Sequence, residues 1–213
     1  MKYDKEIEYW VDLKTCLPRF DFEDLYKDIS DPWGCSQGVD SLPNRIFLEM
    51  LFYPDTVYEN ILDIGCGLGD LSNMIYKKNI QNSGHGGRVT ATDISVAAIK
   101  KAQIKYPEIQ FKKFDLMNES VNGMRKFNLI TMSEVLWYMV SDLDKVFFKL
   151  SQLLTKEGKI AIKQYFPNKQ SYFKEYLSEP IKLEKLLQTH NIRLLSYISI
   201  NSDEGEVACL LFK

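Results

Sequence analysis

A turn with three alternating glycines is the first feature of this sequence that could bind a ligand. Residues 60–71 read Asn-Ile-Leu-Asp-Ile-Gly-Cys-Gly-Leu-Gly-Asp-Leu, so a short apolar run with an acid is followed by Gly65, Gly67 and Gly69. Glycine lacks Cβ, so its backbone adopts positive φ readily and a ligand can lie directly against it. The free N–H groups of the helix that follows would face the same point. The pattern predicts a strand, a tight turn and a helix around a nucleotide-sized site.

The details of this turn narrow the class of nucleotide. The dinucleotide fingerprint needs a third glycine where this chain has Asp70, so that fingerprint is not met. No Lys-Ser or Lys-Thr pair follows the turn, which excludes a phosphate-binding P-loop. A glycine-rich turn that binds no ligand is the alternative when the motif is considered by itself.

Two further acids follow β-prone runs downstream of the turn. Asp93 closes the run 88–93, near the roughly 20-residue spacing expected for an acid that reaches the ribose hydroxyls. A carboxylate can accept both hydrogen bonds of a cis-diol, which explains the residue type. Asp115 closes the run 109–115 in the same way. Taken singly, each Asp could be a turn former or a helix cap. Three acids at strand ends in this order favour a shared ligand.

The residues Asp63-x-Gly65-x-Gly67-x-Gly69 resemble the signature of class I S-adenosylmethionine-dependent methyltransferases. The resemblance implies S-adenosyl-L-methionine as cofactor and S-adenosyl-L-homocysteine as its product. It places Asp63 near the amino-acid portion of the cofactor, Asp93 at the ribose, and Asp115 at the adenine amino group. The full set of residues expected at the cofactor is Asp63, Gly65, Cys66, Gly67, Gly69, Asp93, Ile94, Asp115, Leu116, Ser133, Trp33 and Arg45.

The segment 131–139 should contain the acceptor chemistry, because it follows the fourth strand directly at the carboxyl edge of the sheet. Methyl transfer from a sulfonium is an in-line displacement, so the enzyme aligns the nucleophile, excludes water and, where needed, accepts a proton. Glu134 is the candidate carboxylate, with Tyr138 shaping the acceptor site. Alternatively, Glu134 is a capping acid at a helix N-terminus.

Four segments together look like the nodulation-type methyltransferases, which N-methylate the free amine of a chitooligosaccharide intermediate. They are Asp31-Pro32-Trp33, the helix that carries Arg45, the run 133–138 and the tail 203–211. The resemblance implies a small-molecule acceptor with an amine or hydroxyl, and favours an amino sugar or glycan precursor. An RNA or protein methyltransferase is one alternative. A catalytically silent cofactor-binding or scaffold protein is another.

The rest of the chain alternates strands with helices, as expected for an α/β protein. We expect helices over 71–78, 95–106, 142–154 and 181–189, strands over 127–132 and 159–163, an antiparallel pair over 192–200 and 207–212, and a glycine-rich loop over 79–87. This order matches the doubly wound, Rossmann-like sheet of the resembled family, with seven mainly parallel strands and an antiparallel last strand.

Residues 1–54 precede this pattern and are expected to form an N-terminal helical cap, with residues 55–213 as the methyltransferase domain. Pro43 to Phe52 has the spacing of an amphipathic helix with Pro in its first turn. In methyltransferases such leading helices commonly cover the cofactor. For Trp33, contact with the ligand and packing on the core are both open.

Composition limits the other classes of function. The chain has 213 residues, 45% of them hydrophobic, and a net charge of −2, so no global basic field favours nucleic acid or a membrane surface. The four cysteines are widely spaced, which argues for reduced thiols in the cytoplasm. The two histidines, His85 and His190, are remote from the acceptor segment, so no metal is expected. No run is long enough to span a membrane. The oligomeric state is left open between monomer and homodimer.

Overall fold

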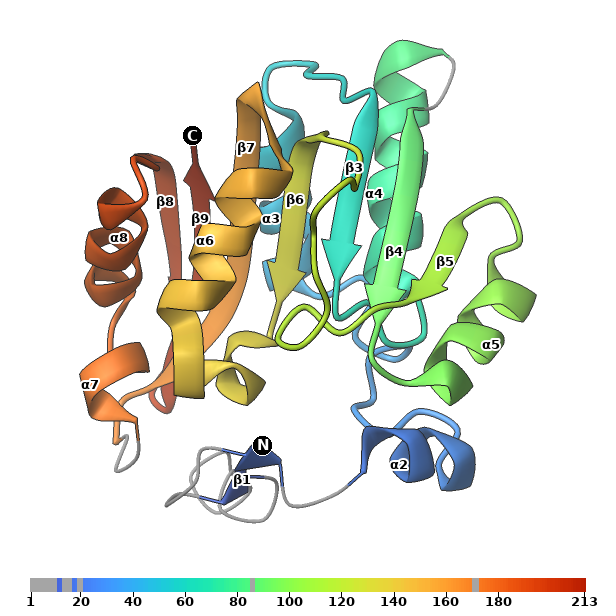
Figure 1. Ribbon diagram of the computed structural model, residues 1–213, viewed down its shortest axis with the longest axis horizontal. Helices are drawn as coiled ribbons and strands as arrows, with labels where there is room; N and C mark the ends of the chain where they lie inside the picture. The colour runs from blue at the N-terminus through green and yellow to red at the C-terminus, as the bar shows by residue number, and fades with distance from the viewer. Residues whose placement is uncertain (1–10, 13–16, 19–20, 85–86, 170–172) are drawn as a thin grey trace.

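A seven-stranded sheet with helices on both faces forms most of the structure, a computed structural model that describes residues 11–12, 17–18, 21–84, 87–169 and 173–213 (Figure 1). The strands of this sheet are β3 (Asn60–Ile64), β4 (Arg88–Asp93), β5 (Gln110–Lys113), β6 (Phe127–Ser133), β7 (Leu154–Pro167), β8 (Leu194–Asn201) and β9 (Gly205–Phe212). A separate two-stranded pair is formed by β1 (Val11–Asp12) and β2 (Leu17–Pro18).

The strand order is β5-β4-β3-β6-β7-β9-β8. Strands β5, β4, β3, β6 and β7 are parallel, and β9 runs antiparallel to both of its neighbours. This arrangement confirms the predicted sheet. The chain winds outward in one direction through β4 and β5 and in the other through β6 and β7, so the carboxyl end of β3 is a topological switch point. Open α/β sheets bind ligands at such a point.

The helices begin and end at identifiable signals. They are α2 (Phe22–Asp28), α3 (Leu42–Phe52), α4 (Asp70–Ser83), α5 (Val96–Lys105), α6 (Leu143–Leu153), α7 (Lys174–Leu177) and α8 (Pro180–Thr189), with short 3₁₀ turns η1 (Leu136–Tyr138) and η2 (Val140–Asp142). Ser95 caps α5 by accepting a hydrogen bond from the N–H of Ala98, and Asp142 caps α6 through the N–H of Lys145. Such caps satisfy N–H groups that have no partner within the helix.

Helix α4 is longer than the sequence predicted, so the expected loop over 79–83 is wrong. Asn79 is buried, and its side chain bonds both the N–H and the carbonyl of Tyr58 at 2.9 Å each. The amide is therefore satisfied inside the helix, and the Asn-rich stretch need not leave it. Gly84 ends the helix in the left-handed conformation, at φ 70°.

Alternate residues of the central strands enter two separate cores, one on each face of the sheet. Ile61 packs with α3, α4 and α5, whereas Leu62 packs with α6 and α8. Helix α3 buries Phe47 and Leu51 completely in the first of these cores, so it shares the hydrophobic core of the sheet.

The crossover between β5 and β6 differs from the others because residues 114–126 contain no helix. Lys149 of α6 holds this crossover by donating hydrogen bonds to three of its carbonyls, those of Leu116, Met117 and Glu119, at 2.6, 3.1 and 2.7 Å. Across the described residues, no helix has the length and apolar character needed to cross a membrane.

Candidate active site

The turn after β3 requires glycine for two reasons: its backbone has positive φ, and neighbouring side chains leave no room for a Cβ. Gly65, Gly67 and Gly69 have φ of 72°, 52° and 81°, which side chains rarely adopt. A Cβ on Gly65 would lie 2.2 Å from Cγ1 of Val135, and one on Gly67 would lie 2.7 Å from the Tyr26 hydroxyl. The N–H groups of Gly65 and Cys66 both donate to the Thr92 carbonyl, at 2.8 and 2.9 Å. The turn is therefore fixed to the end of β4.

Asp93 lies at that end of β4, directly beside the glycine turn. One carboxylate oxygen accepts from the N–H of Gly67 and the other from the N–H of Ser95, each at 2.9 Å. Burial raises the pKa of Asp93, and these backbone hydrogen bonds oppose the rise. The next residue, Ile94, is 46% exposed. The structure thus brings the predicted ribose acid to the glycine turn.

Asp63 is buried beneath the turn and has both carboxylate oxygens occupied. Ser72 of α4 donates to one oxygen at 2.5 Å, and Thr131 of β6 donates to the other at 2.7 Å. Burial raises the pKa of Asp63 to about 6, although both hydroxyl hydrogen bonds oppose this. In this structure Asp63 fastens β3 to its neighbours. Contact with the cofactor stays a prediction.

Asp115 follows the carboxyl end of β5 and shapes the start of the crossover. It accepts hydrogen bonds from the N–H groups of Met117 and Asn118, at 2.9 and 3.1 Å, and from the Asn118 amide at 2.9 Å. These are the contacts of a turn-forming Asp. Leu116 is buried in the core that faces α6. The three predicted acids therefore lie at the same edge of the sheet, Asp63 and Asp93 within β3 and β4 and Asp115 two residues after β5.

Glu134 is held at the tip of β6 in an unusual backbone conformation. Its φ is 58°, a left-handed value that costs on the order of 1–3 kcal/mol in a residue other than glycine. Its Oε2 accepts hydrogen bonds from the Gln164 amide at 3.1 Å and the Tyr165 N–H at 3.0 Å. No donor within the described residues reaches Oε1. Glu134 therefore reaches across to β7, and no side chain caps the η1 turn that follows.

Burial raises the pKa of Glu134, and the charge of Lys163 opposes this rise. Lys163 is 9% exposed and donates a hydrogen bond to Oδ1 of Asn44, which joins β7 to α3. Sequence reasoning missed Lys163, although a charged residue that closes an apolar strand is the signal that identified Asp93. The predicted Arg45 lies on the exposed side of α3, so Asn44 is the residue of this helix that reaches Lys163.

Aromatic residues join the N-terminal segment to the acceptor segment. The Tyr138 ring lies 5.0 Å from that of Phe22, edge to face, and 6.2 Å from that of Trp33. Trp33 donates its indole N–H to the Tyr26 hydroxyl at 3.0 Å. Trp33 thus lies between Tyr138 and the tyrosine above Gly67. Ser133 lies beside Lys163 in the β6–β7 ladder.

The arrangement fits a nucleoside cofactor in several respects. The bare backbone at Gly67 adjoins a carboxylate, and Ile94 leaves apolar surface at the same edge. Gln164 is fully buried, and its Oε1 has no hydrogen-bond partner among the described atoms. The Tyr26 hydroxyl of α2 fills the space next to Gly67, 2.7 Å from where a Cβ on that residue would lie.

The described ranges contain no group of three or more His, Cys, Asp or Glu side chains arranged to hold an ion. His190 pairs with Asp144 at 3.0 Å, far along the chain from the glycine turn. His85 lies outside the described residues. The described cysteines, Cys35, Cys66 and Cys209, are free thiols, and burial raises the pKa of each.

Comparison with known proteins was made by sequence and by fold. Residues 62–160 match the family described as "Methyltransferase domain". The malonyl-[acyl-carrier protein] O-methyltransferase 1 of Ilyobacter polytropus is 29% identical over 164 residues, which cover 70% of this chain and 58% of that protein. The chain therefore spans less than two thirds of this curated relative.

Two solved structures illustrate the similarity of fold. The N-methyltransferase NodS from Bradyrhizobium japonicum, in complex with S-adenosyl-L-homocysteine, has a TM-score of 0.70 and 17% identity, covering 89% of this chain and 96% of that chain. The [4+2]-cyclase SpnF has a TM-score of 0.63 and 13% identity, covering 79% of each chain.

Proposed function

We propose that this chain transfers a methyl group from S-adenosyl-L-methionine to an amine or hydroxyl of a small molecule. Two findings support this: residues 62–160 match the methyltransferase-domain family, and the sheet is the class I methyltransferase fold. The observation that carries the proposal is Glu134. It is a half-buried carboxylate at the same sheet edge as the glycine turn, with one oxygen held by β7 and the other without a donor among the described residues.

For methyl transfer, the protein has to align the acceptor with the methyl group and accept a proton. When bound, the cofactor supplies an electrophilic methyl group on a sulfonium. Oε1 of Glu134 accepts a hydrogen bond from the N–H or O–H of the acceptor and so directs the lone pair of its nitrogen or oxygen toward the methyl group. As the acceptor's nitrogen or oxygen bonds to the methyl carbon, the carbon–sulfur bond would break and S-adenosyl-L-homocysteine would leave, while Glu134 would accept the proton that the acceptor loses. The raised pKa of this carboxyl favours that step.

The residues around Glu134 give the acceptor site its character. Tyr138, Phe22 and Trp33 supply aromatic surface on one side, and sugar rings and other small apolar bodies pack on such surface. Lys163 and Gln164 supply polar groups on the other side. We infer an amino sugar or glycan precursor as the favoured acceptor, which the nodulation-type resemblance supports.

The cofactor half of the proposal is tested by calorimetry with S-adenosyl-L-homocysteine. Gly67→Ala places a methyl group in the space where the ligand would lie, so we expect affinity to fall at least about tenfold. Gly84→Ala is the matched control, since Gly84 has a similar left-handed φ of 70° and no atom within 4 Å of the added Cβ. Equal affinities in the two variants would place the cofactor elsewhere.

The catalytic half is tested with Glu134→Gln, which keeps the shape of the side chain and removes its ability to accept a proton. We expect methyl transfer to fall about 100-fold or more with cofactor affinity unchanged. Glu108→Gln, an exposed acid at the amino end of the sheet, is the control. Transfer at the wild-type rate in Glu134→Gln would remove Glu134 from the mechanism.

To identify the class of acceptor, the protein is added to a cell lysate together with cofactor that carries a labelled methyl group, and the molecules that acquire the label are identified. Label in small molecules, and above all in amino sugars, supports the proposal. Label in RNA or protein would instead support a polymer methyltransferase. No label above that of Glu134→Gln would indicate a binding protein that retains the fold.

A further inference from the structure

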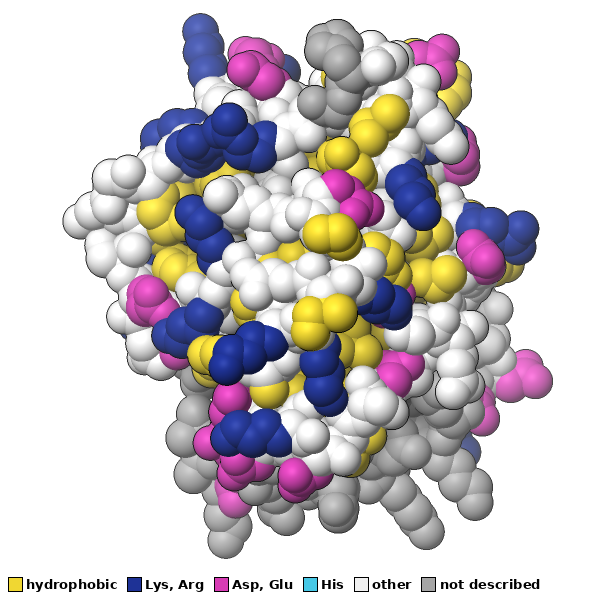
Figure 2. Space-filling view, turned by 90° about the vertical axis from the view of Figure 1, so that its right-hand side faces the viewer, with side chains coloured by type: hydrophobic (Ala, Val, Ile, Leu, Met, Phe, Trp, Pro, Cys, Tyr) yellow, Lys and Arg dark blue, Asp and Glu magenta, His cyan; other side chains and the backbone are white. Residues whose placement is uncertain are grey.

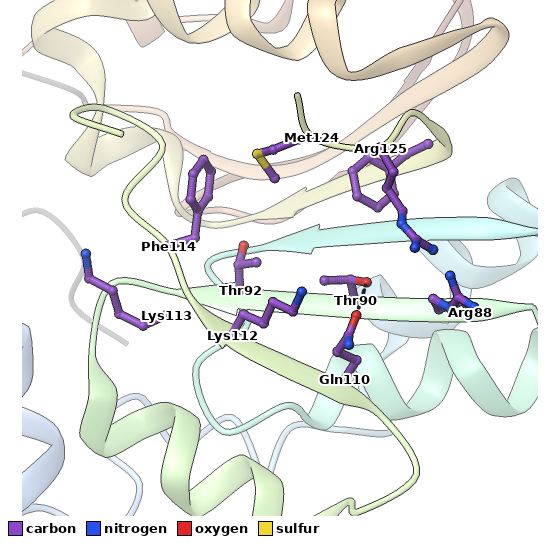
Figure 3. Close-up of a pocket in the computed structure, with 10 residues that line it drawn as sticks. Arg88, Thr90, Thr92, Gln110, Lys112, Lys113, Phe114, Met124 and Arg125 are labelled. Carbon is purple, nitrogen blue, oxygen red and sulfur yellow. Dashed lines mark hydrogen bonds between the residues drawn. The ribbon is translucent and has the colours of Figure 1, made fainter. Parts of the chain in front are cut away.

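A cleft of about 460 Å³ lies on the face of β4 and β5 that no helix covers. Its lining residues are Arg88, Thr90, Thr92, Gln110, Lys112, Lys113, Phe114, Met124, Arg125 and Phe127 (Figure 3). The volume falls within the roughly 300–1,000 Å³ typical of small-molecule sites.

The cleft exists because the crossover from β5 to β6 contains no helix. On β3, the residues of this face are Leu62 and Ile64, which are buried against the core beneath α6. One strand further, their neighbours in the ladder are Thr90 and Thr92. The same face therefore changes from apolar to polar where helical cover ends.

The charge of the cleft has one sign. Four of its lining residues are Lys or Arg and none is Asp or Glu, although the whole chain has a net charge of −2. Arg88 begins β4 and Arg125 lies in the crossover just before β6, and Figure 3 shows their guanidinium groups turned toward the same end of the cleft. Figure 2 shows Lys and Arg side chains gathered along this side of the molecule.

Few of these cations are neutralised by the protein. Lys113 pairs with Glu119 at 2.5 Å, and Arg125 donates to the Asn60 side chain at 3.3 Å. Arg88 and Lys112 form no ion pair within the described part of the chain. Glu59 and Glu108 line the adjoining cleft that Arg88 also borders, but neither lies within 4.0 Å of its guanidinium nitrogens. Two guanidinium groups that face one space without a carboxylate are suited to a bidentate oxyanion.

The other residues that line the cleft indicate the chemical character of the rest of the ligand. Phe114, Met124 and Phe127 form an apolar side, and the hydroxyl of Thr90 bonds the Gln110 side chain at 3.2 Å on the floor. We propose that this cleft binds a phosphorylated small molecule with an aromatic or aliphatic body, its phosphate between Arg88 and Arg125 and its body against Phe114 and Met124. The inference does not rest on the proposed methyl transfer.

The test is a two-dimensional amide NMR titration of the full chain with phenyl phosphate, repeated with inorganic phosphate and with phenol. We expect saturable shifts at Thr90, Thr92, Gln110 and Lys112 with phenyl phosphate, and binding at least about fivefold weaker with either fragment. Saturating S-adenosyl-L-homocysteine should leave these shifts in place, which separates this cleft from the glycine turn.

Charge variants decide whether the arginines are responsible. Arg88→Gln and Arg125→Gln should each weaken phenyl phosphate at least about fivefold, whereas Lys100→Gln, an exposed cation of α5 outside the cleft, should not. Equal weakening in all three variants would indicate a general charge effect and overturn the proposal. So would the absence of saturable shifts, or shifts that appear only with an RNA oligonucleotide.

Discussion

Two carboxylates at the carboxyl edge of the sheet, the buried Asp63 and the half-buried Glu134, accept hydrogen bonds from neighbouring strands and helices. Burial raises the pKa of both, and the charge of Lys163 opposes the rise at each. The two carboxylates differ in how many of their oxygens accept a hydrogen bond. Both oxygens of Asp63 accept hydrogen bonds from hydroxyl groups, whereas one oxygen of Glu134 has no donor in the part of the chain that the structure describes. The first geometry suits a structural acid and the second suits a proton acceptor.

The raised pKa of Asp63 predicts how stability depends on pH. Its value of about 6 in the folded protein lies above the value of about 3.9 expected for an unfolded chain, so the folded state binds the proton more tightly. The contribution of Asp63 to the free energy of unfolding therefore falls as pH rises from 4 to 6 and stays low above that range.

We accordingly expect Asp63→Asn to gain stability relative to wild type, by up to about 3 kcal/mol, between pH 4 and pH 7.5. Urea unfolding at a series of pH values measures this difference. Asp28→Asn, at an exposed position of α2, supplies the baseline. A wild-type to Asp63→Asn difference that does not change with pH would contradict the assignment.

At the scale of elements, the crossover from β5 to β6 contains no helix, and one lysine, Lys149, supplies hydrogen bonds to its backbone. The segment 114–126 has no hydrogen-bonded backbone ladder of its own, and Lys149 supplies partners for three of its carbonyls. This contact also positions Asp115, because the turn that Asp115 forms lies within the same stretch.

Lys149→Met keeps the length of the side chain and removes all three hydrogen bonds. We expect a loss of about 1–3 kcal/mol in the free energy of unfolding, since these bonds come from a charged donor. Backbone hydrogen exchange over 116–119 should become faster. Lys145→Met, one turn earlier on α6, should change neither quantity. Unaltered exchange in Lys149→Met would show that the crossover is held by other contacts.

At the scale of the whole molecule, the N-terminal segment closes over the glycine turn from the side of α5. Glu23 of α2 accepts hydrogen bonds from the Ser95 hydroxyl and the Ala97 N–H, at 3.0 and 2.9 Å, which docks α2 on the start of α5. Tyr26 then lies above Gly67. The cofactor, if it lies on Gly67 as we propose, competes with α2 for this space.

This competition predicts that S-adenosyl-L-homocysteine changes the environment of Trp33, whose indole N–H donates to Tyr26. Titration should alter the tryptophan emission of the wild-type protein, and Trp33→Phe should remove most of that change. An identical response in Trp33→Phe would mean that α2 stays in place when the ligand binds.

The sequence by itself determined the class of fold and the cofactor edge, because both depend on local rules. Glycines at 65, 67 and 69 are needed where φ is positive, and acids such as Asp93 that close strands must meet at one edge of a parallel sheet. The predicted sheet is confirmed, and residues 62–160 match the methyltransferase-domain family that the glycine motif predicted. The end of α4 was mispredicted because the buried side-chain bonds of Asn79 come from Tyr58, which is distant in sequence.

Tertiary structure alone decided what surrounds these residues. The approach of Lys163 to Asn44, the left-handed backbone of Glu134 and the placement of Tyr26 over Gly67 each join segments far apart in the chain. Local propensity and spacing have no information about such contacts. The same holds for the basic cleft, since only the folded sheet brings Arg88 and Arg125 together on a face that no helix covers.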